Sequence, residues 1–403
     1  MIVKMKHDLW NKDYTLELPL PDRWNAKVLH MEGDNKKVLG KEDYGKALEP
    51  LAPMLKGKKE VCVLFDDLSR PTRAYRVLPS LLELFDKAGI RDEQVRFICA
   101  LGTHGALDNA AFRRKLGEEV LERFAVYNHN PYENCEHIGR TALGTPVMVN
   151  KEYLSCDLRI GIGSFVPHGF CGYGGGYKIV FPAISHIDAI QYHHGQLLTE
   201  YRDSCFGLGR CTDNPLLEDM KEYGRIARLD VKIDYLVNSQ AEAVDIYAGH
   251  PDGLYDYMIP KATSHYRTEA PHKADVVFTN AYSKANEASI ALAIGEALLK
   301  DEGGYIVLLC DIDGGQVVHY LLGRFGKDLW GRLAWGERQY SGKVKKVLIY
   351  ARHRDVANEY WFGNRELISW HKDMSEIVQA LGEIYGDRTV DALIIPDGTI
   401  QTL

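Results

Sequence analysis

The chain alternates apolar runs of the length of buried strands with amphipathic segments of the length of helices. VCVLFDD (61–67) and VRFICALG (95–102) are runs of the first kind, and the segments 75–90 and 108–124 that follow them are helix-like. CDLRIGIGSF (156–165) is a further apolar run. Strands that are apolar along their whole length and are separated by helices indicate a parallel sheet with both faces covered. The alternation therefore predicts an α/β fold with mainly parallel sheets.

The pattern restarts late in the chain, and its 403 residues are more than one compact core usually holds. We expect two α/β domains, residues 1–268 and 269–403, with a hinge in the polar segment 263–273 and an active site in the cleft between them. The extreme C-terminus is a candidate to pack back on the first domain. The later strand candidates are 273–281, 303–312, 343–351 and 391–398, with helices at 288–300 and 374–386.

Charge and apolar content limit the partners. A formal net charge of −7 argues against nucleic acid and anionic membrane surfaces, which select basic proteins. No apolar stretch has the length of a membrane span, and the first residues, MIVKMKHDLW, lack a hydrophobic signal core. We expect a cytoplasmic protein. The eight cysteines form no CxxC pair, which favours buried reduced thiols over a zinc site or disulfides.

Three of the predicted strands end in loops with reactive side chains. In open α/β sheets, ligands bind beyond the carboxyl ends of the strands. The first loop, DDLSRPT (66–72), carries Asp67 and Arg70, and the second, LGTHG (101–105), carries Thr103 and His104. The third, VPHGFCGYGGGYK (166–178), adds His168, Gly175, Gly176 and Lys178. Taken singly, an aspartate or serine here could only cap a helix, and a histidine could be structural. Together the three loops predict one shared site.

The glycine-rich loop fits neither of the two familiar phosphate motifs. A P-loop requires Ser or Thr after its lysine, but Ile179 follows Lys178, and the third glycine of GxGxxG would fall on Tyr177. Its glycines could still let backbone amides approach a phosphate. A lysine that enters an apolar run could be desolvated and act as a nucleophile or covalent anchor.

The next segment, 184–200, is predicted to be helical and carries His186, His193 and His194 on roughly one side. It has no HExxH motif, so a zinc protease is disfavoured. A site for nickel, zinc or copper and a merely polar helix face both remain open.

The order and spacing of these motifs resemble the nickel-dependent lactate racemase family. That family has approximately DDxTRPT, LGTHR, PHxxxGxxGGAK and a later NH, and the match runs from Asp66 to His194. The resemblance implies a nickel pincer nucleotide, a pyridinium-3,5-bisthiocarboxylic acid mononucleotide whose two sulfur arms and one carbon bind nickel. It also implies that residues 1–268 form the catalytic and cofactor-anchoring domain.

By position, the resemblance assigns a role to each motif residue. Lys178 would hold the cofactor covalently, and His194 would complete the coordination of nickel. His104 and His168 would be paired acid/base groups, and Arg70 would bind the substrate carboxylate. The residues beside the cofactor would be Asp67, Thr103, Gly175 and Gly176.

The sequence departs from the family pattern in three places, and the last of them bears on the substrate. The loop reads GYK for GAK, and His193 replaces an asparagine, which makes it a conceivable competing ligand. A glutamine and a lysine that reach lactate in the family align with Ile290 and Ala293. Other contacts could come from Tyr282, Lys284, Asn286 and Glu287, although Lys284 and Glu287 could equally be a surface pair.

We therefore predict a racemase or epimerase of a 2-hydroxy acid other than lactate, acting by proton-coupled hydride transfer. Its partners would be the small hydroxy acid and the enzymes that make the cofactor, and the sequence leaves a homo-oligomer open. A nicotinamide-dependent 2-hydroxy acid dehydrogenase is disfavoured by the missing GxGxxG. A non-catalytic carrier of the nickel nucleotide or a hydroxy acid is disfavoured by the set of His104, His168 and Arg70, since a carrier needs no acid/base pair.

Overall fold

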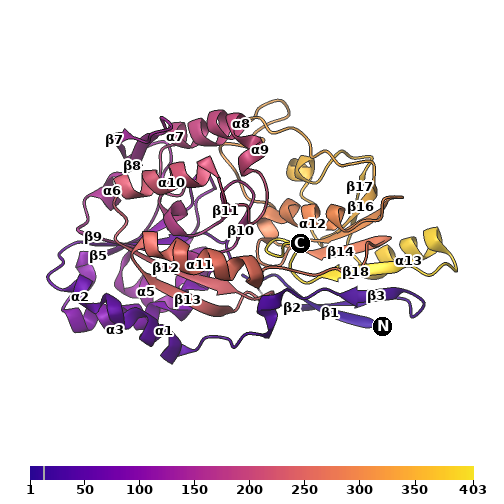
Figure 1. Ribbon diagram of the computed structural model, residues 1–403, viewed down its shortest axis with the longest axis horizontal. Helices are drawn as coiled ribbons and strands as arrows, with labels where there is room; N and C mark the ends of the chain where they lie inside the picture. Colours follow the sequence, from indigo (N-terminus) through magenta and orange to yellow (C-terminus); the bar gives the residue numbers. More distant parts are fainter. Residues whose placement is uncertain (12–13) are drawn as a thin grey trace.

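The computed structural model describes residues 1–11 and 14–403 and contains two six-stranded sheets. The first sheet has the order β13-β12-β9-β4-β5-β6 and is parallel except for the β12/β13 pair. Figure 1 shows it in the half of the molecule that is coloured indigo to pink. Its strands are β4 (Val61–Asp66), β5 (Val95–Ala100), β6 (Ala125–Asn128), β9 (Leu158–Ser164), β12 (Val231–Val237) and β13 (Ala243–Gly249).

The second sheet has the order β17-β16-β15-β14-β18-β3 and is parallel throughout. Its residues divide between two apolar clusters, one that includes helix α12 (Ala291–Ala297) and one that includes α13 (Met374–Tyr385). Both sheets confirm the predicted α/β class. The strands of the second sheet are β3 (Asn25–Val28), β14 (Val276–Asn280), β15 (Gly304–Leu309), β16 (Val344–Tyr350), β17 (Ile368–His371) and β18 (Asp391–Ile395).

The remaining elements cover the sheets or carry loops. The segment 108–124 is two helices, because Gly117 between them has a φ of +88° that ends the first. Two further two-stranded sheets are β7 (Cys135–Arg140) with β8 (Pro146–Asn150) and β10 (Pro167–His168) with β11 (Gly172–Tyr173). The other helices of the first half are α1 (Lys41–Leu48), α2 (Ala52–Leu55), α3 (Leu78–Ala88), α4 (Asn109–Leu116), α5 (Glu118–Arg123), α6 (Lys151–Leu154), α7 (Ile187–Gln191), α8 (Leu198–Glu200), α9 (Arg202–Cys205), α10 (Pro215–Ile226) and α11 (Pro251–His265).

The N-terminal residues lie on the second sheet, which differs from their placement in the unit 1–268. Strand β3 pairs with β18, and the hairpin of β1 (Ile2–His7) and β2 (Tyr14–Pro19) packs on the same side as α13. In Figure 1 these indigo strands lie beside the yellow end of the chain. Strand β3, with the sequence NAKV, is too short and too polar to be recognised as a strand from its own residues. Its partner β18 lies several hundred residues away in the chain, so the pairing leaves no local signal.

The two halves also meet near the chain end. Thr402 pairs with Arg267, and Ile400 belongs to the core of the first half. The proposed hinge is partly regular, because α11 extends to His265 and Thr268 pairs with Met31. Among the described residues, no helix is both long and apolar enough to span a bilayer.

Candidate active site

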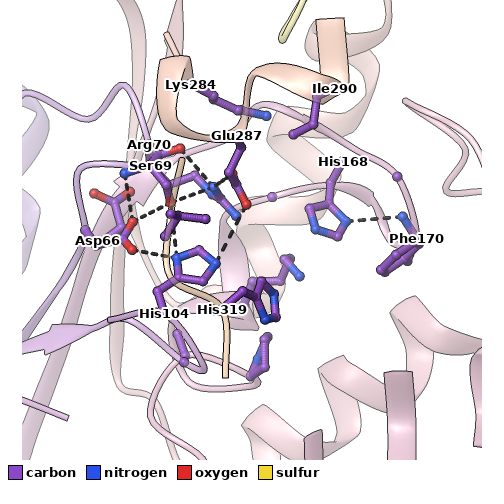
Figure 2. A pocket seen from close by; sticks show the side chains of 18 of the residues that line it. Asp66, Ser69, Arg70, His104, His168, Phe170, Lys284, Glu287, Ile290 and His319 are labelled. Carbon is purple, nitrogen blue, oxygen red and sulfur yellow. Dashed lines mark hydrogen bonds and ion pairs between the residues drawn. The ribbon is translucent and has the colours of Figure 1, made fainter. Parts of the chain in front are cut away.

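A cavity of about 460 Å³ lies where the carboxyl ends of β4, β5 and β9 face the second half. Both halves line it, so the site lies in the predicted cleft between them. Figure 2 shows the part of the cavity around His104 and His168. The sequence-predicted residues that line it are Asp67, Arg70, Thr103, His104, His168, Gly175, Lys178 and His194.

The fully buried side chain of Lys115 stabilises the loop after β4. Lys115 on α4 forms an ion pair with Asp66 at 2.6 Å and donates hydrogen bonds to the backbone oxygens of Asp67 (2.8 Å) and Arg70 (3.1 Å). Asp67 also accepts a hydrogen bond from the Ser69 amide at 2.9 Å, which forms a turn within the loop and does not cap the helices that follow. Lys115 therefore positions the loop without lining the cavity.

We expect Lys115→Met to lower the free energy of unfolding by about 3–5 kcal/mol, because removal of one partner leaves the other charge of a buried pair uncompensated. A urea titration measures the loss. In the double variant Lys115→Met/Asp66→Asn both charges are gone, so part of the stability should return. Equal unfolding midpoints for wild type and Lys115→Met would contradict the assignment.

His104 lies between two carboxylates. Its Nδ1–H donates to Asp67 Oδ2 at 2.6 Å, and its Nε2 lies 3.7 Å from Glu287 Oε1 (Figure 2). Burial alone would lower the pKa of His104, but the charges of Asp67 and Glu287 outweigh it and raise that pKa. Because Asp67 fixes the proton of Nδ1, the neutral ring presents a free Nε2 to the cavity.

His168 has the opposite environment. Burial and the positive charges of Lys178, Arg70 and Lys284 lower its pKa well below the ordinary value. Its Nδ1 accepts a hydrogen bond of 3.2 Å from the amide of Phe170, which places the proton of the neutral ring on Nε2. In this tautomer Nε2 can donate its proton, and it can accept one only after the ring changes tautomer and gives up the bond from Phe170.

The glycine-rich loop is shaped by its neighbours and directs few amides outward. The Gly176 amide donates to Asp234 Oδ2 at 2.6 Å, and the Tyr177 amide donates to Tyr255 at 2.8 Å. A Cβ at Gly176 would lie 2.2 Å from the Tyr255 hydroxyl oxygen, at a φ of +57°. Gly175 lines the cavity, but Gly176 lies behind it, so its amide is not available to a phosphate as the sequence had suggested.

Lys178 follows on a short 3-10 turn, Gly176–Ile179, and reaches the cavity. Burial lowers the pKa of its ammonium group, which increases the fraction of neutral amine. Its amino group has no hydrogen bond or ion pair with the residues that the structure describes. A buried amine of this kind is suited to nucleophilic attack and covalent attachment.

His194 lies on a π-helical turn, Tyr192–Leu197, between α7 and α8, so the predicted helical segment is confirmed with a local widening. His193 is fully buried, with Nε2 donating to the Leu216 carbonyl at 3.1 Å and Nδ1 lying 3.2 Å from Nδ1 of His194. In this arrangement His193 Nδ1 accepts a hydrogen bond from His194 Nδ1–H, which leaves His194 Nε2 free. His193 itself does not line the cavity, and His186 only caps the start of α7.

The second half contributes residues whose location the sequence left open. Lys284 and Glu287 line the cavity and are not a surface pair; the Glu287 carboxylate accepts a hydrogen bond from Arg70. Asn286, Ile290 and Ala293 also line the cavity, whereas Tyr282 packs beside Arg73 outside it. The sequence could not place these residues, because the turn that carries them folds irregularly, with non-helical angles at Glu287.

His319 also lines the cavity, and no sequence pattern had indicated it. It lies in the irregular segment after β15, and its Nδ1 is 3.3 Å from the Thr103 hydroxyl. Its ring lies 5.2 Å from that of His104, and a backbone bridge joins the two residues. Burial lowers the pKa of His319 to about 3, so the ring is neutral. No motif or periodicity surrounds it, so no sequence signal identified it.

The side chains that line the cavity do not form a complete metal site by themselves. The described residues contain no group of three or more His, Cys, Asp or Glu side chains that could hold a metal ion. His194 would therefore be one ligand of a metal whose other ligands come with a cofactor. A tethering amine, one free imidazole nitrogen and a cleft of this size fit a metal-carrying cofactor that supplies the remaining donors.

Comparison with known proteins finds similarity to lactate racemases. Residues 12–205 match the family model for the lactate racemase N-terminal domain. The lactate racemase of Thermoanaerobacterium thermosaccharolyticum is 27% identical over 317 residues, which cover 75% of this chain and 73% of that protein. The lactate racemase of Lactiplantibacillus plantarum is 24% identical over 210 residues, 51% of this chain and 49% of that protein.

Solved structures show the same fold over the whole chain. The lactate racemase apoprotein of T. thermosaccharolyticum superposes with a TM-score of 0.71 at 21% identity, covering 100% of this chain and 99% of that one. A protein from Thermotoga maritima superposes with a TM-score of 0.64 at 17% identity, covering 92% of this chain and 99% of that one.

Proposed function

We propose that the chain, whose residues 12–205 match the lactate racemase N-terminal domain, is an isomerase that racemises or epimerises a 2-hydroxy acid. We further propose that it uses a nickel pincer nucleotide tethered at Lys178, and that its substrate is not lactate. The observation that carries the proposal is the pair His104 and His168, with pKa values moved in opposite directions inside one cavity that also holds Arg70 and Lys178.

The chain's residues would hold the cofactor at two points. The Lys178 amine would form the covalent link, and His194 Nε2, left free by the contact between His193 and His194, would bind nickel. When bound, the cofactor would take a hydride from C2 of the hydroxy acid and return it to either face.

The two histidines would move the hydroxyl proton. Proton abstraction from C2 itself is difficult, because a C–H bond beside a carboxylate is weakly acidic, whereas the hydroxyl proton can leave as the hydride leaves. One histidine would accept this proton from one enantiomer, and the other would donate a proton to the keto oxygen when the hydride returns to the opposite face of C2. Their opposite pKa shifts keep one ring protonated and one neutral over a range of pH, which both directions require.

Arg70 would bind the substrate carboxylate. One terminal nitrogen of its guanidinium, Nη1, donates hydrogen bonds to Ser69 and Glu287. Its Nε and its other terminal nitrogen, Nη2, have no hydrogen bond with residues 1–11 or 14–403. This free edge is suited to bidentate binding of a carboxylate.

The proposal is tested by exchange of the C2 hydrogen. Protein produced together with the cofactor-synthesis enzymes, and protein produced without them, are incubated with a panel of deuterated 2-hydroxy acids. Exchange or inversion should occur only with the first preparation. If every hydroxy acid in the panel is inert with protein that carries nickel and cofactor mass, the chain is a carrier and not a racemase.

His193 should decide how well His194 binds nickel. We expect His193→Leu to lower nickel affinity about 10- to 100-fold, because the partner that orients a ligating histidine is lost. In His193→Asn the side-chain amide can still accept the hydrogen bond from His194 Nδ1–H, so this variant should retain most of the nickel. Metal analysis after dialysis against a chelator measures the content.

His194→Ala provides the reference for complete loss of the protein ligand. Its nickel content should fall below that of His193→Leu. Equal nickel in wild type and His194→Ala would show that another residue binds the metal, and equal nickel in wild type and His193→Leu would remove the orienting role of His193.

A further inference from the structure

Glu287 places a fixed negative charge beside the substrate-binding groups. Its Oε2 accepts a hydrogen bond from Nη1 of Arg70, and its Oε1 lies 3.7 Å from Nε2 of His104. Burial alone would raise the pKa of Glu287, but the charges of Arg70, His104 and Lys284 outweigh it and lower that pKa. The carboxylate therefore stays ionised inside the cavity.

The substrate can bind without displacing this carboxylate. Glu287 accepts a hydrogen bond from Nη1 of Arg70, whereas the substrate carboxylate would bind the free edge formed by Nε and Nη2. In Figure 2 the Glu287 side chain extends from the second half toward Arg70 and His104, with His168 across the cavity. A substrate held between the two histidines thus has Glu287 as a neighbour.

The cavity around His168 has an apolar wall. The Phe170 ring lies 5.5 Å from that of His168, 5.9 Å from Phe206 and 5.8 Å from Trp335. Ile290 also lines the cavity and is labelled near His168 in Figure 2. These side chains can cover a substituent by apolar contact and offer no charge to one that is ionised.

Besides Arg70, the cationic side chains that line the cavity are Lys178, Lys232, Lys284 and Arg338, of which Lys284 lies on the same turn as Glu287. The Lys284 amino group donates to the Pro167 carbonyl at 3.1 Å. Burial, together with the charge of Arg70, lowers the pKa of Lys284 to about 7, so at neutral pH the group is only partly charged. A second substrate carboxylate would therefore meet a full negative charge at Glu287 and only a partial positive charge at Lys284.

We infer that Glu287 is a specificity-determining residue that selects 2-hydroxy acids with one carboxylate and an uncharged, apolar substituent, and rejects those with a second carboxylate. This inference rests on the proposed function, because it assumes that Arg70 binds the substrate carboxylate. Like charges placed together suppress binding of the wrong partner. The charge of Glu287, and not its size, is the selective element.

The test measures binding to the full chain produced without the cofactor-synthesis enzymes. Isothermal titration with 3-phenyllactate and with malate gives a ratio of dissociation constants. We expect wild type to bind malate at least about tenfold more weakly than 3-phenyllactate. In Glu287→Gln the ratio should narrow by about tenfold, mainly through tighter malate binding, whereas Glu287→Asp, which keeps the charge, should leave malate weak.

Glu242→Gln is the matched control. Glu242 also forms an ion pair with an arginine, Arg73, but does not line the cavity, so its loss should leave the ratio unchanged. A wild-type preference for malate, or an unchanged ratio in Glu287→Gln, would overturn the inference. Because the ratio comes from binding, absence of inversion at C2 in cofactor-loaded protein would refute the proposed function alone. Binding of neither acid would overturn the inference alone.

Discussion

Replacement of Lys178 by alanine is expected to abolish the covalent cofactor adduct in protein made together with the cofactor-synthesis enzymes. The physical reason is that Lys178 places a buried amine, with a lowered pKa and no competing hydrogen bond among the described residues, in the cavity. Intact-protein mass spectrometry would show the adduct mass on wild type and only the bare chain mass on Lys178→Ala.

Lys284→Ala separates this role from a general need for a cavity lysine. Lys284 is also buried in the cavity and has a lowered pKa, but its amino group is engaged by the Pro167 carbonyl. This variant should keep the adduct. Persistence of the adduct mass in Lys178→Ala, or its transfer to a peptide without residue 178, would refute the anchor assignment.

His104→Gln and His168→Gln should each reduce the rate of inversion at C2 by about 10²- to 10⁴-fold, because each removes one of the two proton-transfer groups. Both enantiomers should be affected, since one histidine accepts the proton and the other donates it in each direction. Polarimetry with each enantiomer separately gives the two rates. His186→Gln, which lies at the start of α7 outside the cavity, should retain the wild-type rate apart from effects on stability.

The pH profile of kcat/KM gives an independent measure of the same pair. The active state carries one proton, so activity should be lost as pH falls through the lowered pKa of His168 and as pH rises through the raised pKa of His104. Because the two shifts have opposite directions, the plateau should be broad. A rate loss of less than tenfold in His104→Gln, or a profile without an alkaline limb, would remove His104 from proton transfer.

Much of the first half could be predicted from the sequence, because its signals are local. The strand at 61–66 is apolar at every position, and the loops after β4, β5 and β9 carry polar residues where a parallel sheet binds ligands. Eight of the nine residues that the motifs singled out line one cavity. The exception, Gly176, has its amide bound to Asp234, a residue on β12, which no motif connects with the loop.

Other parts of the fold depend on contacts between distant segments. Strand β3 has no strand-like pattern of its own and forms because β18 offers it a parallel edge. The backbone bridge that brings His319 to His104 likewise joins two segments from different halves. Pairings across such separations are set by the packing of the whole chain and leave no periodic trace in either segment.

The sequence by itself determined the α/β class, the resemblance to the lactate racemase family and the order of the motif residues from Asp66 to His194, because apolar periodicity and motif spacing are properties of neighbouring residues. Only the tertiary structure decided which charges face one another. Glu287 meets Arg70 and His104 because an irregular turn of the second half enters the cleft, and the pKa values of both histidines follow from that approach and from burial. Electrostatic interactions depend on distance and on exclusion of water, and neither is encoded in local sequence.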